Sequence, residues 1–189
     1  MKALTIWQPW ANAIMVGAKP VENREWFPPS SAIGTWIAIH AGSHKSDPDD
    51  IDFVRGALDA ERAEGRAIPP MPVGPPSALL GVAFLAAAYR LEDAPDALRR
   101  SRWSFGSVLW HFTEVHRLHE PILGVRGAQG LWTVEDHHAV VLRCRRKWGS
   151  CDGDVLCGMC GRPAREHERV KDCNDGDDGD PRTDGGHAR

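Results

Sequence analysis

A run of prolines sets the firmest limit on how this chain folds. The segment IPPMPVGPPS, residues 68–77, holds five prolines in ten residues. Proline has no backbone N–H and fixes φ, so this segment cannot be regular structure. We therefore expect a long connection between the elements that precede and follow it.

Short elements are expected before this connection. A strand, ALTIWQ, opens the chain, and a helix of about two turns follows until Gly17 ends its pattern. The segment GTWIAIHAG alternates as a strand and points His40 to the same face as Trp36. A surface helix is expected from Asp47, a capping residue followed by proline, to about Gly65.

Strands are expected after the connection. We interpret ALLGVAFLAAAYRL as a strand with a bulge at Gly81, and residues 108–113 alternate as another strand. The segment PILGVRGAQGLWTV adds one or two more. Several short strands, two helices and glycine-rich joints predict an α+β fold built on a small mixed barrel.

Composition limits the domain count and the compartment. The 189 residues, of which 42% are hydrophobic, allow one domain with an appendage. The net charge of −3 equals that of residues 174–189 alone, where five aspartates face two arginines, and it argues against a general basic coat for nucleic acid. No signal peptide and no run of about 18 apolar residues is found. We therefore expect a cytoplasmic protein that does not enter membranes.

One glycine-led turn concentrates charge. The segment GAKPVENREW, residues 17–26, sets Lys19, Glu22 and Arg24 close together and places Trp26 directly after them. Glu22 and Arg24 are two residues apart on an extended segment, so their side chains point the same way. The turn can therefore present cations, a carboxylate and an indole at one place.

Four blocks of sequence resemble the ASCH domain, named for homology to activating signal cointegrator 1, in the PUA-like superfamily. The blocks are QPWANAI, GAKPVENREW, WIAIHAG and PILGVRGAQGLW, in the family's order, and the resemblance spans roughly residues 3 to 135. The most specific part is the pattern G-x-K-x-x-E-x-R. The resemblance implies a domain over residues 1–142: a PUA-like β-barrel with flanking helices, a cleft lined by the turn, and association with RNA or DNA.

A cleft that takes a nucleobase needs cations for phosphate, a flat apolar surface for stacking, and donors or acceptors for the base edge. The predicted nucleic-acid-binding residues of the cleft are Gln8, Trp10, Lys19, Glu22, Arg24, Trp26, His40 and Gln129. In this interpretation the chain binds nucleic acid, with RNA preferred over DNA.

Five of these residues also have a structural interpretation. Glu22 and Arg24 can form an ion pair that supports the turn, and Lys19 can be an ordinary solvated lysine. Trp10 lies at helical spacing, which is typical of a core residue. His40 can be a buried structural histidine, whereas Trp26 follows charged residues and is expected to be exposed.

Two other function classes stay open. The resemblance also includes amidohydrolases that act on N4-acetylcytidine, and ribonucleases. In the amidohydrolases the motif is G-x-K-x-x-T-x-R, with the threonine as nucleophile; Glu22 stands at that position here, so a covalent route is unsupported, although Lys19 and Glu22 together could position a water. The third class is a protein-interaction module.

The cysteine-rich segment, residues 143–173, predicts a structural zinc site. All five cysteines lie here, and the pattern C-x2-C-x6-H-x5-C supplies four soft ligands for a tetrahedral ion. A redox pair or free reduced thiols are the alternatives. The predicted zinc ligands are Cys157, Cys160, His167 and Cys173, with Cys151 or Cys144 as alternates.

Basic residues precede the predicted zinc ligands. The run RCRRKW either contacts nucleic acid or forms a solvated face. Its predicted nucleic-acid-binding residues are Arg143, Arg145, Arg146 and Lys147. Residues 174–189, rich in aspartate and glycine, are expected to be disordered.

Overall fold

The computed structural model describes residues 1–71, 74–135, 138–139 and 142. The chain divides into a unit from Met1 to Ser150, which contains all of these residues, and a unit from Cys151 to Arg189. The predicted tail over residues 174–189 lies outside the described residues. So do the predicted zinc ligands and basic residues: Arg143, Cys144, Arg145, Arg146, Lys147, Cys151, Cys157, Cys160, His167 and Cys173.

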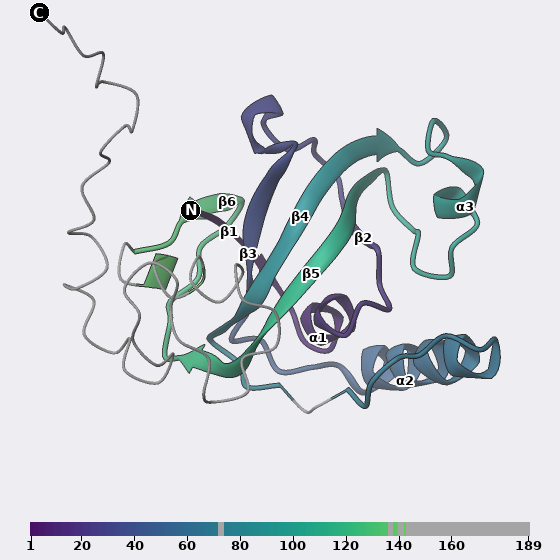
Figure 1. The fold of residues 1–189 in the computed structure, drawn as a ribbon, viewed down its shortest axis with the longest axis horizontal. Helices are drawn as coiled ribbons and strands as arrows, with labels where there is room; N and C mark the ends of the chain where they lie inside the picture. The colour runs from purple at the N-terminus through teal and green to yellow at the C-terminus, as the bar shows by residue number, and fades with distance from the viewer. Residues whose placement is uncertain (72–73, 136–137, 140–141, 143–189) are drawn as a thin grey trace, which may run out of the picture. The chain divides into compact units, whose positions relative to one another are not determined.

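The described residues form one six-stranded mixed sheet with a few helices, which confirms the α+β class. The strand order is β2-β5-β4-β3-β1-β6; β1 pairs with β3 in parallel and all other pairs are antiparallel. The order ends at β2 and β6, so the sheet is an open half-barrel (Figure 1). The strands are β1 Lys2–Ile6, β2 Val21–Arg24, β3 Thr35–Ala41, β4 Ala78–Arg90, β5 Val108–Leu123 and β6 Leu131–Thr133.

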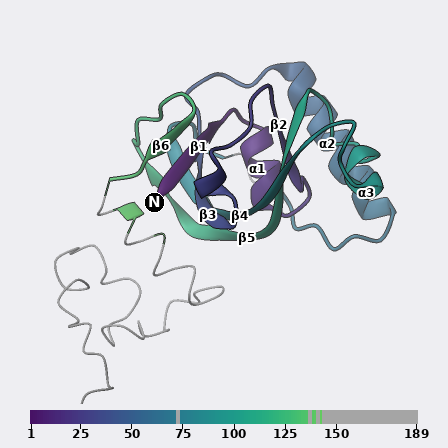
Figure 2. The same ribbon diagram turned by 90° about the horizontal axis from the view of Figure 1, so that it is seen from above.

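The helices pack against the sheet in two of its cores. The described helices are α1 Trp10–Met15, α2 Pro48–Ala63, α3 Asp96–Arg99 and the short 3-10 helix η1 Ser30–Ala32. In Figure 2 the sheet curves around α1, whose Ile14 is fully buried against it. The Oδ1 atom of Asp47 accepts a hydrogen bond from the N–H of Asp49 at 2.9 Å, so α2 begins at the predicted cap. Among the described residues, no helix has the length and apolar character needed to cross a membrane.

The β4–β5 ladder explains one difference from the expected strands. The predicted bulge at Gly81 is present, and there the register passes from the pair Leu79–Ile122 to the pair Gly81–Arg117. Residues 118–121 therefore have no register partner in β4. Pro121 falls in this irregular stretch, where a missing N–H breaks no ladder hydrogen bond. As a result β5 continues to Leu123, whereas the sequence predicted a new strand there.

Three hydrophobic core clusters pack against the sheet, and β3 contributes to two of them. Alternate residues of β3 divide between them: Ile37 and Ile39 join the core that contains α1, and Ala38 joins the core on the opposite face. His40 pairs in register with Leu79, which belongs to the opposite core. The predicted alternation of β3 side chains is therefore confirmed: Ile37 and Ile39 lie on one face of the sheet, and Ala38 and His40 lie on the other.

Candidate functional site

The turn after α1 carries the charged motif. Gly17 has φ of +75°, a left-handed conformation that glycine adopts readily, and it ends the helix. The N–H groups of Ala18 and Lys19 both donate to the carbonyl of Ala13, at 3.2 and 3.1 Å. This folds the chain back tightly, so that Lys19 lies directly before the edge strand β2.

Lys19, Glu22 and Arg24 form one chain of ion pairs, the Lys19–Glu22–Arg24 cluster. Lys19 Nζ donates to Glu22 Oε2 at 2.6 Å and to the carbonyl of Val21 at 2.5 Å. Glu22 Oε1 lies 3.2 Å from Arg24 Nη2, which also donates to the carbonyl of Thr5 at 2.8 Å. The predicted convergence of the three side chains and the Glu22–Arg24 pair are both present.

Burial differs sharply along this cluster. Lys19 is 2% exposed and Glu22 is 7% exposed, so the interpretation of Lys19 as a solvated lysine is wrong. The side chain of Arg24 keeps 25% of its surface exposed, and its Nε is buried without a hydrogen-bond partner among the described residues. Arg24 is therefore the member of the cluster that a ligand can reach from solvent, through the exposed quarter of its side chain.

Burial lowers the pKa of Lys19 below its usual value of 10.5, because an ammonium loses hydration in the interior. The charge of Glu22 and its hydrogen bond oppose this and raise the pKa, while the charge of Arg24 lowers it further. Burial thus outweighs the support that Glu22 gives to the charged form of Lys19.

Trp10 lies beside this cluster. Lys19 Nζ is 5.9 Å from the centre of its ring, and the indole packs against both the α1 core and the core beneath α2. It also meets Phe53 and Phe105, with ring centroids 5.5 Å away in each case. Trp10 is only partly buried, so a packing role and a contact with ligand are both open to it.

The exposed aromatic residues follow Arg24. Trp26 is 37% exposed and makes a T-shaped contact with Trp110 at 4.6 Å, and the indole N–H of Trp110 donates to the carbonyl of Trp26. Phe27 is 46% exposed, and the guanidinium carbon of Arg90 lies 6.0 Å from the centre of its ring. The predicted exposure of Trp26 is confirmed. We call Arg24, Trp26, Phe27 and Arg90 the Arg24 surface.

Three other predicted residues do not belong to this surface. Gln8 is buried at the start of α1, where its Oε1 accepts the N–H of Asn12 at 3.2 Å. His40 is buried on the opposite face of the sheet, and its Nε2 lies 2.9 Å from the carbonyl of Val125. Gln129 is exposed in the loop between β5 and β6.

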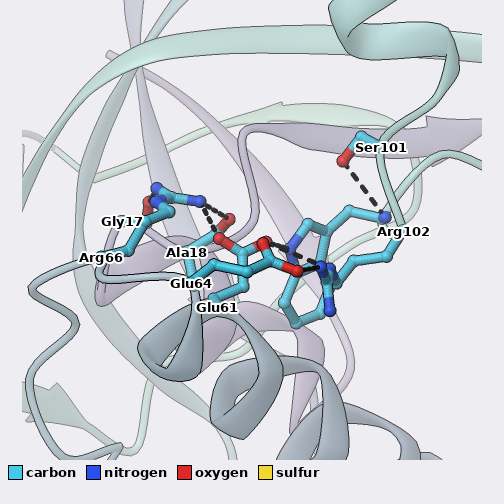
Figure 3. Close-up of polar contacts among 8 residues, drawn as sticks. Gly17, Ala18, Glu61, Glu64, Arg66, Ser101 and Arg102 are labelled. Atoms are coloured by element: carbon cyan, nitrogen blue, oxygen red, sulfur yellow. Dashed lines mark hydrogen bonds and ion pairs between the residues drawn. The ribbon is translucent and has the colours of Figure 1, made fainter.

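Sequence reasoning missed a buried carboxylate that holds the turn in place. Glu61 of α2 is 5% exposed, pairs with Arg66, and accepts the indole N–H of Trp103 at 2.8 Å (Figure 3). Arg66 donates in turn to the carbonyls of Gly17 and Ala18, at 3.0 and 3.4 Å. The residue before Lys19 is thereby tied to α2.

Asn23 of β2 forms a second set of hydrogen bonds that hold this region together. Asn23 points away from Glu22 and Arg24, donates to the carbonyl of Trp103 at 3.0 Å, and accepts the N–H of Phe105 at 2.9 Å. The loop that contains Trp103 and Phe105 is therefore bound both to α2 and to β2. Neither the Glu61 contacts nor the Asn23 contacts could be predicted from the sequence, because a glutamate on a helix and an asparagine beside charged residues are ordinarily exposed to solvent.

Metal ligands are not gathered in the described part of the chain. Among residues 1–71, 74–135, 138–139 and 142, no group of three or more His, Cys, Asp or Glu side chains could hold a metal ion. The predicted zinc ligands belong to the cysteine-rich segment, so zinc stays a prediction.

Acid should weaken the fold through His40. Burial lowers the pKa of its imidazole, so the unfolded chain, with a histidine pKa near 6.5, binds a proton that the folded chain does not. The free energy of unfolding should therefore fall as pH drops below about 6.5, by up to about 1.4 kcal/mol per pH unit from this histidine. Urea unfolding between pH 7 and 5 should show a shallower dependence for His40→Gln, and equal slopes would contradict this.

Comparison with known proteins gives matches among solved structures. No protein-family model matches the sequence, and no curated protein matches it. The chain is similar to ASCH from Zymomonas mobilis, with 15% sequence identity and a TM-score of 0.42 over 74% of this chain and 90% of that chain. Two variants of that protein, with a serine changed to alanine or a tyrosine changed to phenylalanine, match with 16% identity, a TM-score of 0.42 and 75% of this chain covered; their own coverage is 93% and 95%. The matched structures are thus of ASCH proteins, the family that the sequence motifs resemble.

Proposed function

We propose that this chain is an ASCH-type, PUA-like domain that binds single-stranded nucleic acid, RNA in preference to DNA, through the Arg24 surface. One observation carries the proposal. The guanidinium of Arg24 is held by the buried carboxylate of Glu22 and the carbonyl of Thr5, yet a quarter of its side chain stays exposed beside Trp26.

A fixed guanidinium is suited to phosphate or to a base edge. Its donors lie in a rigid plane, and a paired carboxylate orients that plane without occupying all of it. Lys19 stabilises Glu22 from the other side, so the arrangement costs little to reorganise when a ligand binds. Arg24 therefore supplies a pre-oriented cation.

The exposed aromatic residues supply surfaces on which bases can stack. Single-stranded nucleic acid is bound by cations that follow the backbone and by aromatic rings on which bases stack. Trp26 and Phe27 are exposed in the segment after Arg24, and Arg90 lies over Phe27. Two cations, at the ends of β2 and β4, thus accompany two exposed rings in the segment after β2, a combination that fits an unpaired strand better than a duplex. The 2′-hydroxyl gives RNA additional hydrogen bonds that DNA lacks.

Fluorescein-labelled RNA and DNA of the same single-stranded sequence, titrated at several salt concentrations, test this function. Arg24→Gln should weaken RNA binding on the order of tenfold and make the salt dependence shallower by about one phosphate contact. Lys19 remains to pair with Glu22 in this variant, so the fold should persist. Thermal unfolding checks that the variant is folded.

The matched control is Arg55→Gln, which removes the same charge from an exposed arginine of α2 paired with Asp52. Its affinity should stay within about twofold of the native chain. The proposal is wrong if the native chain shows no salt-dependent binding to either strand, or if both variants weaken binding equally.

A second candidate function is hydrolysis of a modified nucleoside. The close Lys19–Glu22 pair, 2.6 Å apart, favours it, and the lowered pKa of Lys19 agrees with it, because such a lysine can act as a base towards a water held with Glu22. Acetate release from N4-acetylcytidine by the native chain, lost in Lys19→Met, would favour hydrolysis over binding alone. No release by the native chain would remove this candidate.

A further inference from the structure

We propose that Trp7 and His44 form a second stacking platform, which takes one unpaired nucleobase of a strand bound at the Arg24 surface. The two residues belong to none of the sequence-predicted sites. This inference rests on the proposed function and names where a base is held.

The two rings already form a stack. Trp7 is 56% exposed, and its ring centre lies 4.3 Å from that of His44 with an angle of 26° between the planes. Most other aromatic pairs of the described residues meet at steep angles, such as 84° for Trp26 and Trp110. A near-parallel, exposed pair offers the arrangement that a base extends by stacking.

The ends of two parallel strands hold the platform in place. Trp7 follows β1 and His44 lies three residues after β3, so both stand at the same edge of the sheet. The N–H of Gly42 donates to the carbonyl of Ile6 at 2.9 Å. A Cβ added to Gly42 would lie 3.0 Å from Trp7 Cδ1, so glycine lets the indole lie close against the backbone.

Thr5 connects the platform to Arg24. The carbonyl of Thr5 accepts a hydrogen bond from Arg24 Nη2 at 2.8 Å. The methyl group of Thr5 packs beside Gly42, as the Trp7 indole does: a Cβ added to Gly42 would lie 3.3 Å from Thr5 Cγ2. Thr5 therefore contacts Arg24 through its backbone carbonyl and the platform through its side chain, which lies on the face of His40 and not on that of Glu22. The platform is thus a stacking position separate from the Arg24 surface, and a strand of several nucleotides can occupy both.

Charge and size favour a nucleobase over a protein partner. Lys45, the exposed residue after His44, adds a cation beside the platform. A stable protein interface needs about 800 Å² from each partner, whereas a single base needs only one ring to stack on. The platform consists of two rings, which fits the smaller ligand.

Homopolymeric RNA tests the platform. Twelve-residue oligomers of adenylate and uridylate, fluorescein-labelled, should bind Trp7→Ala about 5- to 150-fold more weakly than the native chain, with the larger loss for adenylate because it stacks better. The dependence of affinity on salt should stay unchanged, since no phosphate contact is lost. Trp7→Phe should recover part of the affinity, and His44→Ala should weaken binding in the same direction.

Ile33→Ala is the matched control. Ile33 is 39% exposed before the start of β3, at the edge of the sheet opposite His44, and its loss should leave the affinity unchanged. If Trp7→Ala and His44→Ala bind like the native chain while Arg24→Gln binds weakly, the platform is wrong and the proposed function stands. If the native chain binds neither oligomer, the proposed function itself fails. A shallower salt dependence in Trp7→Ala would also contradict stacking.

Discussion

Glu22→Leu is expected to lower the free energy of unfolding by about 3–5 kcal/mol at pH 7, because it leaves a buried lysine without its counter-charge. Lys19 Nζ loses the carboxylate 2.6 Å away and keeps only the carbonyl of Val21 as an acceptor among the described residues. Arg24 then adds repulsion that nothing offsets. Urea unfolding at pH 7 measures the loss.

Alkaline pH should restore part of this stability. Without Glu22 the folded pKa of Lys19 falls further below 10.5, so the unfolded chain binds the proton more tightly than the folded chain. Stability then rises with pH over the window between the two pKa values. A loss that is the same at pH 7 and at pH 10 would contradict this account.

Removing both partners should cost less than removing one. In Lys19→Met with Glu22→Leu no uncompensated charge is buried, and apolar replacements of a buried ion pair are often close to neutral. The control is Asp96→Asn, which breaks two exposed pairs, with Arg99 and Arg100, and should change stability by no more than about 0.5 kcal/mol. A double variant as unstable as Glu22→Leu would show that the pair itself contributes the stability.

Local patterns in the sequence were sufficient to predict most elements. Period-two alternation predicts β3, and capping by Asp47 with a following proline predicts α2. The convergence of Glu22 and Arg24 also follows from local geometry, because residues two apart on a strand share a face. These predictions depend only on residues that are close together in the sequence, so the sequence alone is enough to make them.

Burial of the site depends on distant partners and could not be predicted. Lys19 reads as solvated because nothing near it in sequence shows that α2 and the Trp103 loop enclose the turn. Glu61 reads as an exposed helix residue until Arg66 and Trp103 are found around it. His40 was assigned the correct face, but only the strand register shows that this face is opposite to that of Glu22.

A large loss of stability is also expected from a substitution at the Gly81 bulge, for a steric reason. A Cβ on residue 81 would lie 2.3 Å from the carbonyl oxygen of His116 and 2.9 Å from the Cα of Arg117, both backbone atoms of β5. The register shift that makes the bulge brings this backbone over residue 81, so the clash cannot be relieved by a side-chain rotation.

Gly81→Ala should therefore destabilise the fold by about 1–3 kcal/mol, the usual cost of overpacking, as measured by the urea midpoint at an unchanged slope. Gly56→Ala is the matched control: Gly56 is exposed in α2 and an added Cβ meets nothing within 4 Å, so alanine should stabilise the helix by about 0.5–1 kcal/mol. The same substitution should thus have opposite signs at the two positions. If both variants were stabilised, β5 would not approach β4 at residue 81 as closely as the bulge requires.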